Sequence, residues 1–151
     1  MKEIETILIY NNEVSSEHPE RHYGKYLITF RPEKRSVEYE DLLRDKPIRT
    51  LVNYSKFDEL FSFVCSLLLL NTPKPGCGYH RNFRNVNEYH KWRNGLDLVE
   101  EEILWRMNVH YTDGSFETSI FMDCEKVPSN LSRLENQVKR ILGMKHDQNR
   151  H

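Results

Sequence analysis

The chain has 151 residues, of which 38% are hydrophobic and 11% aromatic, so it is long enough for one domain whose core needs neither disulfides nor a metal. A formal net charge of −1 and a mean hydropathy of −0.74 argue against a globally basic nucleic-acid binder, although a local basic patch stays open. The near-zero charge also leaves a homo-oligomer open.

Three strands are expected before the first helix, at residues 3–10, 25–31 and 36–40. The first carries apolar residues on both faces, which predicts a place inside the sheet. Residues 11–24 and 41–53 are expected to be connections.

A helix is expected over 54–70, where apolar residues recur at helical spacing. Its length is too short for a membrane span, and it contains Asp58 and Glu59. Residues 1–12 lack the basic start and cleavage site of a secretory signal. We therefore expect a cytoplasmic protein with no membrane segment.

Residues 73–95 are expected to form a loop through about Asn85, then a short helix from Asn87 to Asn94 that Gly95 ends. Within 74–93, basic residues outnumber the single acid, Glu88, and alternate with aromatic residues and histidines.

The clearest pattern is a β-hairpin over 103–122, in which apolar residues alternate on both arms around Asp113-Gly114. A two-residue loop would place Tyr111 opposite Phe116 and Trp105 opposite Met122, so that the mainly apolar faces of both strands coincide. The opposite face of the hairpin could be solvated or covered by the segment 73–95.

A second main helix is expected after Pro128, with Leu134 and Val138 on its core face and Gly143 at its end. We expect residues 1–143 to form a single α+β domain, with an antiparallel sheet of about five strands and two main helices packed on one face. Residues 144–151 are expected to be a frayed polar tail.

The basic and aromatic residues of 74–93 have three interpretations. They suit a protein interface, where Tyr, Trp and Arg supply much of the binding energy. They also suit single-stranded nucleic acid, which needs cations and stacking planes. Alternatively, the aromatic residues anchor a long loop on the core while the cations pair with Asp97 and Glu100–Glu102. If the segment is a contact surface, the residues expected to carry it are Arg81, Arg84, Tyr89, Trp92 and Arg93.

Cys77 and His80 have a spacing that could begin a zinc site, although no second pair of ligands follows. Other ligands would have to come from His90, His110 or Cys124. Cys77 could also act as a nucleophile with a histidine as base. The three cysteines fall at irregular spacing, unlike a disulfide framework. We expect no metal or other cofactor, and Cys77 and His80 are the weak candidates.

No phosphate-binding loop or hydrolase motif occurs in the sequence. The leading hypothesis is a small intracellular module, possibly of the inhibitor or immunity type, that acts by binding another protein. The alternative is a nucleic-acid binder that uses 74–93, and the third is a zinc- or thiol-dependent enzyme.

Overall fold

The computed structural model describes residues 3–12, 25–41, 47–52, 54–70, 73, 76–98, 102–122 and 129–141. The strands are β1 (Ile4–Asn12), β2 (Lys25–Arg31), β3 (Ser36–Asp41), β4 (Pro47–Val52), β5 (Gly78–Phe83), β6 (Ile103–Tyr111) and β7 (Phe116–Met122). The helices are α1 (Tyr54–Leu70), α2 (Val86–Asn94) and α3 (Ser129–Ile141).

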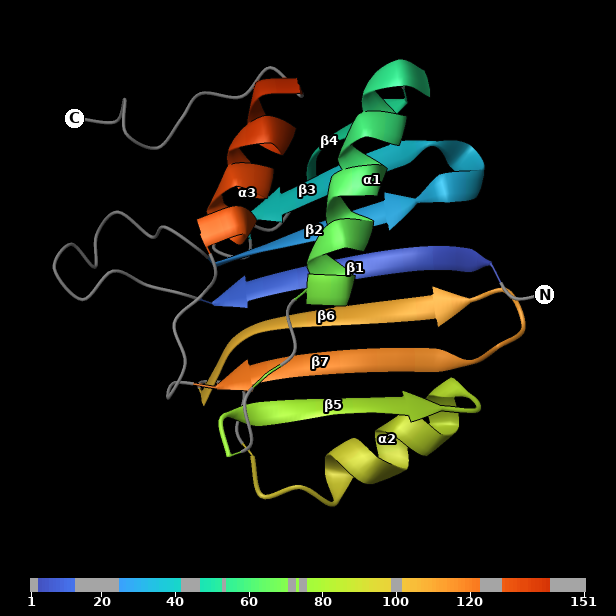
Figure 1. The fold of residues 1–151 in the computed structure, drawn as a ribbon, viewed down its shortest axis with the longest axis vertical. Coiled ribbons are helices and arrows are strands. Elements are labelled where there is room, and N and C mark those ends of the chain that lie inside the picture. The colour runs from blue at the N-terminus through green and yellow to red at the C-terminus, as the bar shows by residue number, and fades with distance from the viewer. Residues whose placement is uncertain are drawn as a thin grey trace, which may run out of the picture.

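The seven strands form one sheet in the order β4-β3-β2-β1-β6-β7-β5, and every neighbouring pair is antiparallel (Figure 1). The strand β1 lies at the centre, where it pairs with β2 on one side and β6 on the other. The α+β class is therefore confirmed, as is the internal position of β1. The sheet has more strands than expected because residues 41–53 and 73–85 each contain a strand, β4 and β5, that the sequence analysis assigned to connections.

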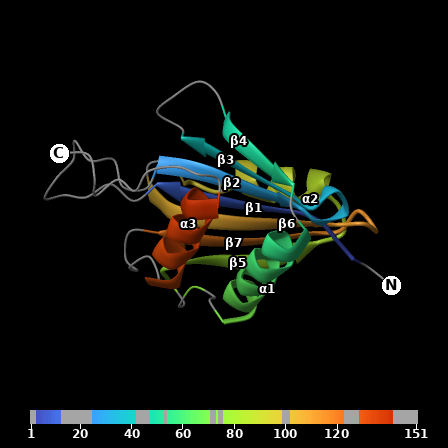
Figure 2. The same ribbon diagram turned by 90° about the horizontal axis from the view of Figure 1, so that it is seen from above.

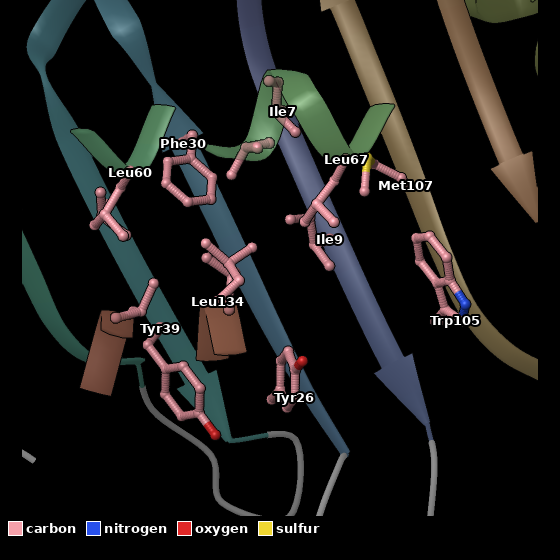
Figure 3. Packing of buried hydrophobic residues seen from close by; sticks show 14 of the residues in the cluster. Ile7, Ile9, Tyr26, Phe30, Tyr39, Leu60, Leu67, Trp105, Met107 and Leu134 are labelled. Atoms are coloured by element: carbon pink, nitrogen blue, oxygen red, sulfur yellow. The ribbon is translucent and has the colours of Figure 1, made fainter. Parts of the chain in front are cut away.

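The two main helices, α1 and α3, lie side by side on one face of the sheet, as expected, and α2 lies on the opposite face (Figure 2). The core under α1 and α3 combines apolar residues of five strands, β1, β2, β3, β6 and β7, with the inner faces of both helices (Figure 3). Within it, Leu60 and Leu134 reach the sheet from α1 and α3, and Trp105 stacks on Phe121 with ring centroids 4.0 Å apart.

A second core lies on the face that carries α2. It contains Ile103, Ile120, Leu98 and Tyr10, with Trp92 of α2 packed against it. The central and α2-side strands of the sheet therefore bury side chains on both faces, which explains why β1 carries apolar residues on both sides.

The predicted register of the β6–β7 hairpin is wrong by one residue. Phe116 lies opposite His110, and Trp105 lies opposite Phe121. The loop has three residues instead of two, since Tyr111 N–H donates to the Ser115 carbonyl at 3.0 Å and Gly114 adopts φ 89°. This is the arrangement of a type I turn followed by a glycine in the left-handed region. Consequently Trp105 and Met107 share a face with Phe121, while Ile120 and Phe116 face α2.

No helix in the described part of the chain is long and apolar enough to cross a membrane. The predicted helix end at Gly143, the polar tail at 144–151 and Cys124 lie outside the described residues.

Candidate functional site

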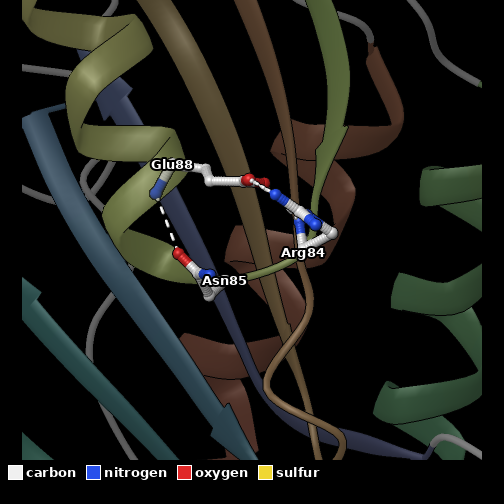
Figure 4. A network of polar contacts seen from close by, with 3 residues as sticks. All are labelled: Arg84, Asn85 and Glu88. Atoms are coloured by element: carbon white, nitrogen blue, oxygen red, sulfur yellow. Dashed lines mark hydrogen bonds and ion pairs between the residues drawn. The ribbon is translucent and has the colours of Figure 1, made fainter.

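The candidate contact segment folds as one unit, the edge strand β5 followed by α2. Asn85 sits between them in an extended conformation, and its side chain accepts a hydrogen bond from Glu88 N–H at 3.0 Å, which caps the helix (Figure 4). The helix ends at Gly95, as predicted. A loop was expected before Asn85, yet strand β5 occupies 78–83, where Tyr79, Arg81 and Phe83 alternate with His80 and Asn82.

An aromatic layer joins α2 to the sheet. Tyr89 packs on Phe116 with ring centroids 4.5 Å apart and on Phe83 at 5.6 Å. Trp92 lies 5.4 Å from Phe83 and 5.5 Å from Tyr79. These contacts fix the helix on β5 and β7. These aromatic residues therefore anchor the segment on the core, as the third interpretation of the sequence expected for them.

Packing in the aromatic layer determines how much of each predicted contact residue is exposed to solvent. Tyr89 is only 6% exposed and belongs to the core, so it is unsuited to a direct contact. Trp92 is half-buried between the ring of Tyr79 and that of Phe83. It is an anchor for its own domain, and a partner could reach only part of its ring.

Arg81 is an exposed cation that lies against the aromatic layer. Its side chain is exposed, and the guanidinium carbon lies 5.6 Å from the Trp92 ring centroid and 5.5 Å from that of Phe83. Stacking on two rings holds the guanidinium in place while leaving its donors available. Among the described residues, no carboxylate forms an ion pair with Arg81.

Arg84 is engaged within the domain, in contrast to Arg81. Its guanidinium donates to Glu88 at 2.7 and 3.0 Å, and its backbone N–H donates to the same carboxylate at 3.0 Å (Figure 4). These hydrogen bonds lower the pKa of Glu88 and raise that of Arg84. The pair neutralises one of the expected cations, so Arg84 contributes less net charge to the surface than the sequence suggested.

The remaining cations differ in exposure. Arg93 is half-buried and donates to the Leu98 carbonyl at 3.2 Å, which ties α2 to the segment that follows it. Lys91 and His90 are exposed on α2. The structure therefore brings Arg81 and Trp92 together and places Lys91 on the same helix as Trp92, while Arg93 makes a hydrogen bond within the domain.

The metal and thiol candidates lie at the start of β5: Cys77 is half-buried just before the strand, and His80 lies within it. His80 lies opposite Ser119, with Nδ1 2.8 Å from the serine Oγ and Nε2 3.4 Å from Glu117 Oε2. Glu117 in turn accepts from the Tyr111 hydroxyl at 2.7 Å. Within the described ranges, no three His, Cys, Asp or Glu side chains gather in a way that could hold a metal ion.

Sequence reasoning missed the free edge of β5. The alternation in residues 78–83 was the signal, but Gly78 and the polar side chains made the segment resemble a loop.

No protein-family model, curated protein or solved structure matches this chain. Its function must therefore be inferred from the geometry of this surface.

Proposed function

We propose that the chain is a protein-binding module whose contact surface is the exposed side of β5 and α2. Arg81, Lys91 and the accessible part of Trp92 form the centre of this surface. An inhibitor or an immunity protein would act in this way, by covering a surface of its target without catalysing a reaction.

The stacked Arg81 is the observation that carries the proposal. A guanidinium held over two rings has lost side-chain freedom before any partner arrives, so less conformational entropy is lost on binding. Arginine and tryptophan are also the residue types that dominate the energy of protein interfaces. An acidic patch on a partner would supply the carboxylates that Arg81 lacks among the described residues.

The aromatic layer favours a protein over single-stranded nucleic acid. Bases stack on aromatic rings whose faces are open. Here Phe83, Tyr89 and Phe116 are buried against one another, and Trp92 is covered in part by its neighbours. The surface thus offers cations and one partly exposed ring, which suits acidic side chains better than a run of bases.

The experiment is a pull-down of the tagged protein from lysate, with and without nuclease, read by mass spectrometry. The test variant combines Arg81→Glu with Lys91→Glu. The control combines Lys34→Glu with Arg140→Glu, which makes the same change in net charge at exposed positions outside β5 and α2. Thermal unfolding checks that both variants fold.

We expect one stoichiometric protein that survives nuclease, is lost with the test variant and is kept by the control. Equal loss in both variants would reduce the effect to overall charge and contradict the site. A partner signal that disappears with nuclease would instead support nucleic-acid binding. So would a steep salt dependence, in which the logarithm of the binding constant falls with the logarithm of the salt concentration with a slope of about one for each phosphate neutralised.

A further inference from the structure

The outer edge of β5 carries backbone groups that the sheet does not use. Met122 N–H donates to the Cys77 carbonyl at 3.0 Å, which fixes the phase of the β5–β7 ladder. In an antiparallel pair the residues alternate between bonding the neighbouring strand and facing away from it. Tyr79, Arg81 and Phe83 therefore bond β7, and the N–H and C=O groups of Gly78, His80 and Asn82 point outward.

This edge is accessible along its polar part. β5 is the last strand of the sheet, and no described strand pairs with its outer side. His80, Arg81 and Asn82 are exposed, and α2 packs on one face of the sheet (Figure 2). A row of outward backbone groups beside an exposed surface is a template for an added strand.

The contacts of Arg84, just beyond the end of β5, show which kind of side chain this edge can bind. Arg84, two residues beyond Asn82, also directs its N–H outward, and that N–H is bound by the Glu88 carboxylate at 3.0 Å. The same carboxylate binds the Arg84 guanidinium at 2.7 Å. An acidic side chain therefore satisfies both a backbone donor and a cation of this edge within the domain itself.

The positive charges beside the β5 edge favour an acidic segment as the added strand. Arg81 lies on β5, and Lys91 and His90 are exposed on α2. If β5 paired with β5 of a second copy about a twofold axis, the same cations of both copies would lie on one side of the joined sheet. Like charges brought together in this way are unfavourable. A segment that carries glutamate or aspartate would relieve this charge.

We propose that the partner binds by adding an extended acidic segment as a further strand along β5. Its backbone bonds the outward groups of Gly78, His80 and Asn82, and its acidic side chains on the α2 side meet Arg81 and Lys91. This inference rests on the proposed function, because it specifies how the same surface would hold a protein. Backbone bonds would supply affinity, and the cations would supply selectivity.

The test uses capped eight-residue peptides and the whole protein. The first peptide alternates glutamate and valine, the second replaces glutamate by lysine, and the third is the first with alternate backbone nitrogens methylated. NMR amide shifts and hydrogen exchange across the chain report where each peptide binds. We expect the acidic peptide to shift and protect the amides of His80 and Asn82, and the other two to bind at least about tenfold more weakly.

A pair of variants separates the backbone from the side chain. Asn82→Pro removes an outward N–H, and proline is tolerated at such positions of edge strands. Asn82→Ala removes the side chain and keeps the N–H. We expect the proline variant to bind the acidic peptide about tenfold more weakly than the alanine variant. Thermal unfolding and the β7 amide shifts establish that both retain the fold.

Equal binding of the methylated and unmethylated peptides to the unmodified protein would overturn strand addition, even if Asn82→Pro failed to fold. So would the absence of amide shifts along β5 at millimolar peptide. The two proposals fail separately. A captured partner that is lost with Arg81→Glu and Lys91→Glu but binds Asn82→Pro as well as Asn82→Ala would leave the protein-binding function in place and reject the added strand.

Discussion

Thr118 and Asn108 face each other across β6 and β7, and the Thr118 hydroxyl donates to the Asn108 side-chain oxygen at 2.5 Å. Both residues are buried, with exposed fractions of 0% and 8%. They lie on the face that carries α2, between the cross-strand pairs His110–Phe116 and Arg106–Ile120. The hydrogen bond satisfies two polar groups that this register places in the interior.

Thr118→Val should therefore destabilise the fold by about 1–3 kcal/mol, because it leaves the Asn108 oxygen buried without this donor. Urea unfolding of the variant measures the change. The double variant Asn108→Leu with Thr118→Val is the control, and it should recover part of the loss because both polar groups are removed. A single variant as stable as the unmodified protein would contradict the bond.

Gly78 allows β5 to lie against β7. A Cβ added there would collide with the Ile120 carbonyl oxygen and lie 2.7 Å from Pro73 Cβ. Gly78→Ala should destabilise the fold by about 1–3 kcal/mol, as measured by thermal or urea unfolding. Gly95→Ala is the matched control, since an added Cβ there would meet only ordinary contacts at 3.6 Å. The control should change stability by less than about 0.5 kcal/mol.

The Arg84–Glu88 pair predicts a local response to acid. Hydrogen bonds from Arg84 lower the pKa of Glu88 from 4.5, so the stabilisation is present above that value and is lost as the pH falls through the lowered pKa. An NMR titration of the Glu88 carboxyl should show this, and Arg84→Ala should return the pKa toward 4.5. An unchanged pKa in that variant would show that the pair is absent in solution.

His110 predicts a second pH dependence, at higher pH. Burial against the sheet lowers its pKa from 6.5, although Glu5 nearby opposes the shift. The unfolded chain then binds a proton more readily, so stability should fall as the pH decreases from above 6.5 through the lowered folded pKa. Urea unfolding at about pH 8 and about pH 5.5 measures the change. In His110→Gln this decrease should be smaller, and an identical decrease would assign it to other groups.

The order of the helices and strands was predictable wherever apolar residues recurred clearly at either helical or strand spacing. The bounds of α1 matched the expected 54–70, and β2 matched 25–31. The register of the hairpin was not predictable from alternation, because β7 carries large apolar side chains on both faces, Ile120 on one and Phe121 on the other. The choice depends on the loop, where Asp113 accepts hydrogen bonds from Ser115 N–H at 2.8 Å and from its hydroxyl at 2.5 Å.

The candidate site was predictable as a segment but not as a surface. The interleaved cations and aromatic residues located β5 and α2, yet only the packing shows that Tyr89 is interior and that Arg84 is neutralised by Glu88. An aromatic residue at helical spacing has the same sequence signature whether it faces the core or a partner. The free backbone edge has no side-chain signature at all.

The central position of β1 has a consequence for the synthesis of the chain. Strand β2, which pairs with β1, and strand β3, which pairs with β2, follow soon after β1, so this meander can form early, whereas β6 begins only at Ile103. Until that strand leaves the ribosome, one side of β1 has no neighbour, and its backbone groups resemble an aggregation-prone edge. We therefore expect a stage of synthesis in which the central strand of the sheet has one unpaired side, and a chaperone would have most to protect at that stage.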